Sequence, residues 1–305
     1  MRIRRVGAYG ICRDDSGRVL LARNSPLSEF PGLWTLPGGG VEQGEHPDDA
    51  VVREFGEETG LAVRIDGLNT VTADLARLSG GDLEHTDRII YDVSVTGGTL
   101  RNEAEGTTEL VEWVADPAAL PLMPFTAAAL LPSAGAASPP PPGATPSPPP
   151  DEELARPARV QRFGAYAAAS DPEGRILLTR IATGYPGAGR WHVPGGGTDH
   201  GETPEAALAR EVFEETGQHG RVTGLVEISH RYDPAAVGPE GVPIDWHVIR
   251  VLFRFEVDTP TEPQVKEVDG STAEARWFTP AQARRLDLTE PAAVAVARIG
   301  AERAS

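Results

Sequence analysis

Residues 39–60 read GGVEQGEHPDDAVVREFGEETG, and residues 196–217 read GGTDHGETPEAALAREVFEETG. Both stretches place a glycine-rich segment before an acidic one. Their separation is constant, since 196 − 39 and 217 − 60 both give 157. The same offset holds upstream, where the tripeptide GAY occurs at 7–9 and again at 164–166. The chain therefore contains a tandem duplication.

The composition between the two copies indicates a linker. Residues 132–150 consist almost entirely of Pro, Ala, Ser and Gly, which cannot build a core and favour an extended spacer. We therefore predict an N-terminal domain at 1–131, a linker at 132–157 and a C-terminal domain at 158–305. Each half shows strands, one central helix, more strands and a terminal alanine-rich helix, near 117–131 and 280–303. This order predicts an α/β layered fold.

The overall charge limits the class of partner. A formal net charge of −17 argues against binding to a nucleic-acid polymer or an anionic membrane surface. No segment approaches the ~18 apolar residues of a membrane span. Cys12 is the only cysteine, so an intrachain disulfide and a cysteine-built metal site are excluded. These features favour a cytoplasmic protein. A small anionic substrate is still compatible, because a bound divalent cation reverses the local potential.

Both acidic segments predict an amphipathic helix. Pro47 and Pro204 suit the first helical turn, and the glycines at positions 60 and 217 suit a left-handed residue at the helix end. At ~100° per residue, Val51 and Phe55 fall on one face, as Leu208 and Val212 do in the second copy, and three glutamates occupy an adjoining arc.

The clustered glutamates predict a metal site in each copy. They are Glu54, Glu57 and Glu58 in the first copy, and Glu211, Glu214 and Glu215 in the second. Carboxylates at this density repel one another unless a positive group lies among them, and oxygen ligands suit Mg²⁺ or Mn²⁺. Arg53 lies four residues before Glu57, as Arg210 does before Glu214, and is placed to orient that carboxylate. A solvated acidic face is the alternative, but both the preceding glycine loop and the copying of each charge argue against it.

These residues carry a family resemblance. Both stretches resemble the Nudix box, G-x5-E-x7-R-E-U-x-E-E-x-G-U, where U is a bulky aliphatic residue, as in MutT-like proteins. The matching positions are Gly39, Glu45, Arg53, Glu54, Phe55, Glu57, Glu58, Gly60 and Leu61, then Gly196, Glu202, Arg210, Glu211, Val212, Glu214, Glu215, Gly217 and Gln218. Phe55 and Gln218 depart from the pattern, and we expect Gln218 to loosen packing after the second helix. The resemblance implies two tandem Nudix-type α/β/α sandwich domains around mixed sheets.

The resemblance also implies a reaction. Nudix hydrolases cleave a phosphoanhydride bond in small nucleoside diphosphate-linked compounds, such as nucleoside triphosphates or ADP-ribose, with glutamate-bound Mg²⁺. The positions expected around the cofactor are Gly39, Gly40, Glu45, Gly196, Gly197 and Glu202, of which the two glutamates either support the metal site or are structural. The alternative is a Nudix-type nucleotide-binding sensor in which one or both sites do not turn over. A tandem chain could be a monomer with an intramolecular domain pair, or a homodimer.

The general base and the substrate contacts are expected outside the box. In Nudix hydrolases a further glutamate often serves as base or metal ligand, and Glu103 and Glu267 stand at matched positions. The candidates for substrate contact are His85, Arg88, His247 and Arg250. Each of these residues could equally be an ordinary surface residue. Trp34 and its counterpart Trp191 are expected to belong to the core rather than to a stacking platform.

Overall fold

The computed structural model describes residues 2–102, 106–131, 157–238, 241–268 and 270–302. They form two compact units, one of Met1–Gln161 with Arg231–His247 and one of Arg162–His230 with Val248–Ser305. Residues 132–156 of the predicted linker lie outside the described residues, so the linker and the domain boundaries beside it stay predictions.

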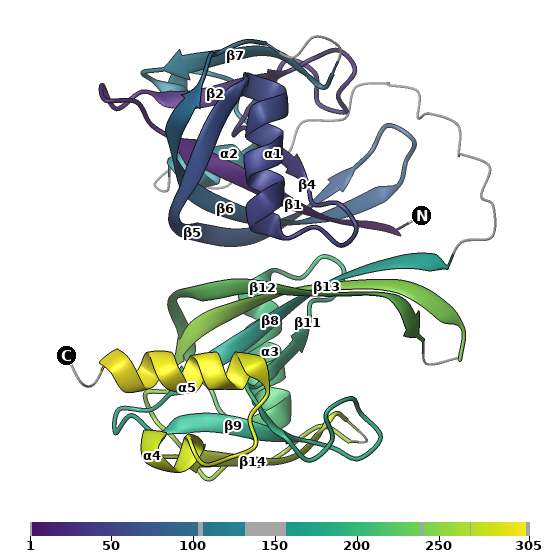
Figure 1. Cartoon of the computed structure of the whole chain (residues 1–305), viewed down its shortest axis with the longest axis vertical. Helices are drawn as coiled ribbons and strands as arrows, with labels where there is room; N and C mark the ends of the chain where they lie inside the picture. The colour runs from purple at the N-terminus through teal and green to yellow at the C-terminus, as the bar shows by residue number, and fades with distance from the viewer. Residues whose placement is uncertain (1, 103–105, 132–156, 239–240, 269, 303–305) are drawn as a thin grey trace. The chain divides into compact units, whose positions relative to one another are not determined.

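The first repeat is built on a mixed sheet. Its elements are β1 (Arg2–Cys12), β2 (Val19–Asn24), β3 (Trp34–Thr35), β4 (Gly38–Gly40), α1 (Pro47–Thr59), β5 (Leu61–Arg77), β6 (Leu83–Gly98), β7 (Thr108–Val114), a 3₁₀ turn (Pro117–Ala119) and α2 (Pro124–Leu130). One sheet has the order β4-β1-β6-β5, and a second has the order β3-β2-β7 (Figure 1). β1 runs parallel to β6 and antiparallel to β4.

The alternation of side chains along β1 places the two helices on opposite faces of the sheet. A Cβ atom at Gly10 would meet the Phe55 ring of α1 at 2.6 Å. The neighbouring residues Tyr9 and Ile11 pack instead with Phe125 of α2. Successive residues of a strand face opposite sides, so α1 covers one face and α2 the other. The predicted α/β/α sandwich is confirmed.

The second repeat follows the same plan. Its elements are β8 (Ala158–Ser170), β9 (Ile176–Ile181), β10 (Trp191–His192), β11 (Gly195–Gly197), α3 (Pro204–Thr216), β12 (Arg221–Val237), β13 (Pro243–Glu256), β14 (Thr272–Phe278), α4 (Pro280–Ala283) and α5 (Glu290–Glu302). The strands join in the order β10-β9-β8-β13-β12, with β11 paired to β8 and β14 paired to β9. Ala292 and Val296 of α5 pack on Ile176 and Leu178 of β9.

The central helices begin and end where the sequence predicts. The Thr203 side chain accepts a hydrogen bond from the Ala206 N–H at the start of α3. Gly60 (φ 71°) and Gly217 (φ 69°) end α1 and α3 in the left-handed conformation. All four apolar residues predicted to face the core are fully buried: Val51, Phe55, Leu208 and Val212.

The prediction of one continuous terminal helix in each half was wrong. In the first repeat Leu122 forms a β-bridge with Trp34, which separates the 3₁₀ turn from α2. In the second, Leu288 forms the same bridge with Trp191 and separates α4 from α5. Pairing with a strand requires extended backbone, so the helix stops in spite of its alanine-rich composition. Trp34 itself is buried in the core, as predicted.

Gln218 also behaves differently from the prediction. Its side chain is buried, and the amide nitrogen donates to the Thr216 carbonyl and to Thr261 Oγ1. The amide oxygen accepts from the Thr261 N–H at 2.9 Å. Because both ends of the amide are hydrogen-bonded, Gln218 ties the loop at Thr261 to the end of α3 instead of loosening it.

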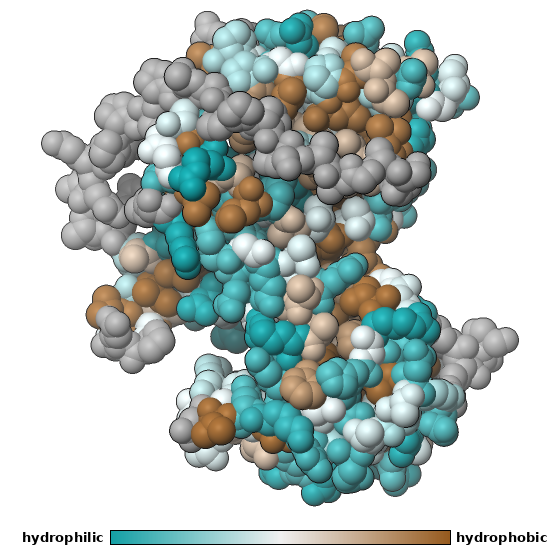
Figure 2. Space-filling view, turned by 180° about the vertical axis from the view of Figure 1, so that it is seen from behind, coloured by the Kyte–Doolittle hydropathy of each residue, from teal (hydrophilic) through white to brown (hydrophobic). Residues whose placement is uncertain are grey.

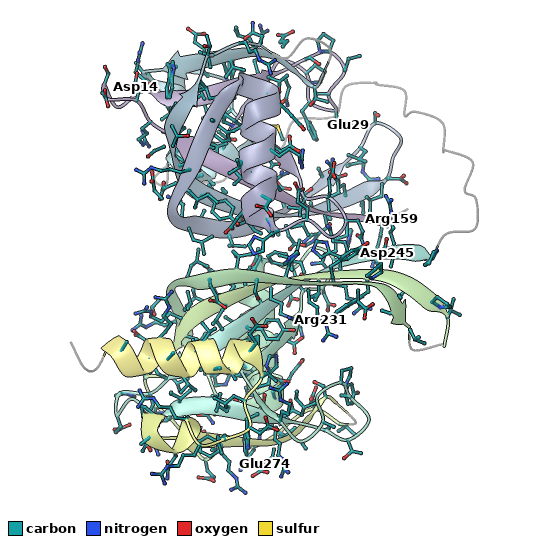
Figure 3. The ribbon with its side chains drawn as sticks, viewed as in Figure 1. Asp14, Glu29, Arg159, Arg231, Asp245 and Glu274 are labelled. Atoms are coloured by element: carbon teal, nitrogen blue, oxygen red, sulfur yellow. The ribbon has the colours of Figure 1, made fainter. Side chains whose placement is uncertain are left out.

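The visible surface is largely hydrophilic. Figure 2 shows hydrophilic residues over much of the face it presents, interspersed with smaller hydrophobic areas. Asp14, labelled in Figure 3, forms an ion pair with Arg18 at 2.7 Å. Every helix in the described part of the chain is too short or too polar to span a bilayer.

Candidate active site

Arg53 connects the glycine loop with three glutamates of the first repeat. Its Nε and Nη2 atoms donate to both oxygens of Glu45 at 2.9 and 3.0 Å. Nη1 donates to Glu54 at 2.8 Å and to Glu57 at 3.1 Å, the latter at the spacing the sequence predicted. Nη2 also reaches the Gly40 carbonyl at 3.0 Å. One guanidinium therefore supplies positive charge among the carboxylates.

Arg210 makes the same contacts in the second repeat. It donates to both oxygens of Glu202 at 3.0 and 2.9 Å, to Glu211 at 2.8 Å and to Glu214 at 3.2 Å. It also donates to the Gly197 carbonyl at 3.2 Å. The hydrogen bonds that Arg210 donates to Glu202 and Glu211 raise the Arg210 pKa further above its ordinary value, so this side chain stays charged. Glu45 and Glu202 thus act by holding the arginine.

Glycine is needed at positions 39 and 196 because a carboxylate lies against the backbone there. A Cβ atom on Gly39 would lie 2.6 Å from the nearest carboxylate oxygen of Glu54, and one on Gly196 would lie 2.7 Å from the Glu211 carboxylate. Burial raises the pKa of both Glu54 and Glu211, and the charge of the next glutamate along the helix adds to this, while the arginine opposes it. In each site a single arginine therefore bonds three carboxylates.

The last glutamate of each cluster is buried behind the loop. Glu58 accepts hydrogen bonds from the Gly38 N–H at 2.9 Å and from Thr108 Oγ1 at 2.7 Å. Glu215 accepts from the Gly195 N–H at 2.8 Å and from Thr272 Oγ1 at 2.5 Å. Burial, together with the nearby charges of two other glutamates, raises the pKa of Glu215 to about 8, and these hydrogen bonds oppose the rise.

The donor chemistry of these clusters fits a divalent cation. Every candidate ligand is a carboxylate oxygen, the donor that Mg²⁺ and Mn²⁺ prefer. Burial raises the Glu54 and Glu211 pKa values most, neighbouring carboxylates add to the rise, and a bound cation would favour the charged form of both groups. Among the described residues, however, no three His, Cys, Asp or Glu side chains are already gathered as a metal-binding group. In the first repeat Arg53, Gly38 and Thr108 hold the carboxylates apart.

Of the two glutamates predicted outside the box, only Glu267 lies among the described residues. Glu103 lies outside the described residues. Glu267 is anchored to the end of α3, because its backbone N–H donates to the Glu214 carbonyl at 3.0 Å. Its carboxylate accepts from the Thr272 N–H at 3.1 Å, and its charge raises the pKa of both Glu211 and Glu215. The structure therefore brings Glu267 close to the second cluster.

The histidines and arginines predicted to contact substrate differ in which side of the sheet they face. His85 and His247 are fully buried, and His85 Nε2 lies 3.1 Å from Asp87 Oδ1. In the continuous strand β6, residues 85 and 88 face opposite sides of the sheet, so only Arg88 reaches the side that carries the site. A direct substrate contact by His85 is therefore not supported. Arg250 lies close enough to Tyr166 that it opposes the rise in the Tyr166 pKa caused by burial.

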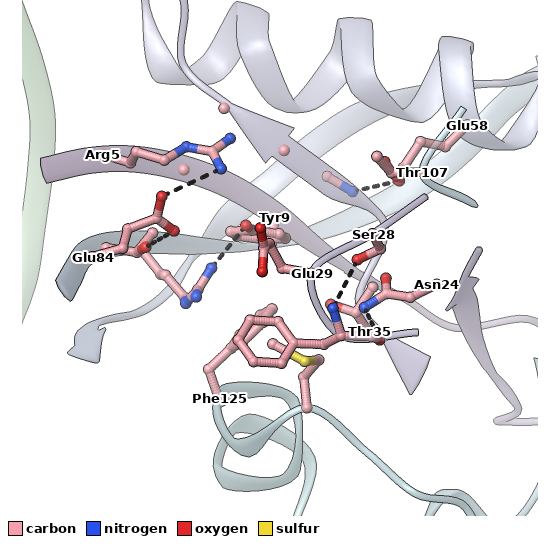
Figure 4. A pocket seen from close by; sticks show the side chains of 18 of the residues that line it. Arg5, Tyr9, Asn24, Ser28, Glu29, Thr35, Glu58, Glu84, Thr107 and Phe125 are labelled. Carbon is pink, nitrogen blue, oxygen red and sulfur yellow. Dashed lines mark hydrogen bonds and ion pairs between the residues drawn. The ribbon is translucent and has the colours of Figure 1, made fainter. Parts of the chain in front are cut away.

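A cavity of about 400 Å³ opens beside the first glycine loop (Figure 4). Its lining includes Gly38, Gly39 and Glu58 of the glutamate site, together with Tyr9, Arg88 and Phe125. Glu29 (Figure 3), in the loop before β3, closes a further side through hydrogen bonds from Ser79 at 3.1 and 3.2 Å. The sequence reasoning missed Tyr9 and Phe125. The repeated GAY tripeptide was a signal for Tyr9, whereas nothing in the first copy alone marked Phe125.

Comparison with known families explains why the arrangement occurs twice. Residues 1–132 and 160–299 both match the family model described as the NUDIX domain. The chain belongs to the NUDIX domain family. The Nudix match includes both arginine-centred glutamate clusters and both glycine loops.

Individual Nudix relatives match single segments of the chain. It is 39% identical over 97 residues to an ADP-ribose pyrophosphatase of Methanocaldococcus jannaschii, which covers 32% of this chain and 54% of that protein. It is 37% identical over 54 residues to an 8-oxo-dGTP diphosphatase of Escherichia coli, which covers 18% of this chain and 42% of that protein. The chain thus spans about half the length of these relatives. A MutT NUDIX hydrolase structure from Burkholderia pseudomallei aligns with 45% of this chain and 97% of its own, at 31% identity and a TM-score of 0.35.

Proposed function

We propose that this protein is a divalent-metal-dependent pyrophosphohydrolase with two active sites, one in each Nudix repeat. The observation that carries the proposal is the duplicated network in which Arg53 or Arg210 holds three glutamates beside a glycine loop. The names of two relatives, an ADP-ribose pyrophosphatase and an 8-oxo-dGTP diphosphatase, support nucleoside diphosphate derivatives as the substrate class.

The glutamates of each cluster would hold Mg²⁺ or Mn²⁺: Glu54, Glu57 and Glu58 in the first repeat, and Glu211, Glu214 and Glu215 in the second. The bound cation supplies charge neutralisation for the diphosphate and acidifies a water molecule. Arg53 and Arg210 fix the carboxylates in position, and each is fixed in turn by Glu45 or Glu202. Hydrolysis then consists of water attacking one phosphorus atom, while the phosphoanhydride bond breaks and the second phosphate departs.

The water must lose a proton during this attack. In the second repeat we assign that proton to Glu267, which is anchored next to Glu214 and lies close enough to Glu211 and Glu215 to raise their pKa values.

The test is metal-dependent release of phosphate or nucleoside monophosphate across a panel of nucleoside triphosphates, ADP-ribose and dinucleotides. Wild type is compared with Glu57→Gln, Glu214→Gln and the double variant. The double variant should lose hydrolysis of every substrate, and each single variant should retain the activity of the other repeat. Full turnover by the double variant would refute the proposal, and binding without any turnover in wild type would identify a sensor.

A further inference from the structure

The first compact unit includes a segment that the second repeat encodes. Residues 231–237 end strand β12 and residues 243–247 begin strand β13, and both belong to the first unit. We call these two strand ends the hairpin arm. Gln161 of β8 belongs to the first unit as well. The first unit therefore contains side chains that its own repeat does not supply.

The hairpin arm contacts the loop between β4 and α1 of the first repeat. The Gly44 N–H donates to His247 Nδ1 at 3.2 Å. The Gln43 side-chain amide donates to the Asp245 carbonyl at 2.9 Å and to Asp245 Oδ1 at 3.1 Å. A Cβ atom on Gly44 would lie 2.9 Å from the Tyr232 ring, so the arm packs closely against a glycine. Three residues of the arm thus hold two consecutive residues of the loop.

Gln161 adds a third point of attachment. Its amide nitrogen donates to the Val41 carbonyl at 3.1 Å and lies 3.3 Å from His247 Nδ1. The Gly44 N–H and the Gln161 amide both present an N–H to this nitrogen, so Nδ1 is the unprotonated atom of the imidazole. His247 itself is fully buried. The centre of the contact is therefore a buried imidazole that acts as an acceptor.

The loop that the arm holds leads directly into the arginine network. Glu45 follows Gly44 in the chain and accepts the Arg53 guanidinium on both carboxylate oxygens. The Glu45 N–H donates to the Glu42 carbonyl at 3.1 Å, and the Glu42 N–H donates to the Glu45 carboxylate at 2.9 Å. Residues 42–45 thus form one tight turn. A displacement of this turn moves Glu45, and with it Arg53 and the glutamates that Arg53 bonds.

The chemistry of the contact indicates positioning rather than simple packing. Two of its bonds end on the backbone of the loop, at the Val41 carbonyl and the Gly44 N–H, and such bonds fix the path of the chain. The loop contains glycines at positions 39, 40 and 44, and glycine backbone loses the most conformational freedom on ordering. External hydrogen bonds therefore help to keep Glu45 in place.

We propose that His247 and Asp245 of the hairpin arm are positioning residues for the first active site, although the second repeat encodes them. They hold Gln43 and Gly44, and thereby keep Glu45 and Arg53 in the arrangement that gathers the glutamates. The first site thus depends on the second repeat for full activity. This inference rests on the proposed function, and it assigns His247 to the first site instead of to a substrate of the second.

The kinetic test uses the Glu214→Gln background, in which only the first repeat turns over. His247→Ala removes the acceptor and should lower kcat roughly tenfold, the usual effect of losing an outer support of a metal site. KM should stay within twofold, because the arm holds the loop and not the substrate. His247→Asn should restore kcat to within threefold of its parent, because asparagine Oδ1 stands at the same position along the side chain as Nδ1 and accepts the same bond.

Two further variants separate positioning from folding. Gln43→Ala breaks the bonds to Asp245 from the side of the loop, so the buried strand β13 is left intact. It should lower kcat roughly fivefold, the fold-change that corresponds to one ordinary hydrogen bond. Arg231→Ala is the matched control, because Arg231 is an exposed residue of the arm next to Tyr232. It should change neither kcat nor KM.

Hydrogen exchange at the Gly44 amide tests the contact without turnover. The amide should be protected in wild type, exchange at least tenfold faster in His247→Ala, and stay protected in His247→Asn. The proposal is overturned if His247→Ala and Gln43→Ala keep the parental kcat, if His247→Asn loses as much kcat as His247→Ala, or if Arg231→Ala loses as much as either. A wild type that hydrolyses nothing would refute the proposed function, and loss of Gly44 protection in His247→Ala would then support the positioning of the loop by itself.

Discussion

Replacement of Gly39 by alanine should disable the first site without unfolding the repeat. The new Cβ atom would meet the Glu54 carboxylate at 2.6 Å, whereas ordinary contacts begin at 3.4 Å, so the carboxylate has to move by about 3.4 − 2.6 = 0.8 Å. Misplacement of a catalytic group by about 1 Å can cost on the order of 100-fold in rate. We therefore expect kcat to fall roughly 10- to 100-fold. The free energy of unfolding should fall by only about 1–3 kcal/mol, the usual cost of overpacking.

The assay uses the Glu214→Gln background, in which only the first repeat turns over. Gly56→Ala is the matched control, because a Cβ at Gly56 in the last turn of α1 meets nothing within 4 Å. Alanine is the better helix former, so this control should keep its kcat and gain about 0.5–1 kcal/mol in unfolding free energy. The reasoning is wrong if Gly39→Ala retains kcat within threefold of its parent, or if Gly56→Ala loses as much activity.

Three further predictions concern charge and metal. Arg210 bonds three carboxylates through its guanidinium, and Arg210→Lys leaves a single ammonium in its place. We expect the free energy of unfolding to fall by about 2 kcal/mol and the melting temperature of the second unit to fall by roughly 4–8 °C. An unchanged melting temperature in calorimetry would contradict the role of the network. Glu267→Gln in the Glu57→Gln background should lower kcat on the order of 100-fold, whereas Glu262→Gln, at an exposed position of the same loop, should have no effect; equal rates for the two would remove Glu267 from the mechanism. Chelation of divalent cations should abolish hydrolysis and Mg²⁺ should restore it, so turnover that persists in excess chelator would exclude the metal role.

The catalytic cluster was predictable because its geometry is local. Residues four apart on a helix are neighbours, so the Arg53–Glu57 contact follows from spacing alone. The bonds from Arg53 to Glu45 and Gly40 follow less directly, since they require the glycine loop to fold back beside α1. The constant offset between the copies supports each assignment a second time, because the same residue type recurs at the matching position.

The substrate contacts are harder to predict, because the sequence of a strand does not show which of its two faces lines the site. His85 and Arg88 were grouped by closeness in sequence, yet alternation along β6 puts them on opposite sides, with His85 buried against Asp87. The predicted terminal helices are longer than the observed ones for a related reason. Alanine content favours a helix, but pairing of Leu122 with Trp34 requires extended backbone.

The sequence by itself determined the duplication, the helices that carry the glutamates and the glycines on which the loops depend. The duplication follows from the repeated offset of 157 residues. The helices and glycines are set by spacing within about twenty residues, where helix periodicity and backbone sterics leave few choices. Only the tertiary structure decided the cavity, because Tyr9, Arg88 and Phe125 come from β1, β6 and α2 and meet only after the sheet has formed. Contacts across such separations depend on strand register and on which face each residue takes, and no local pattern encodes both.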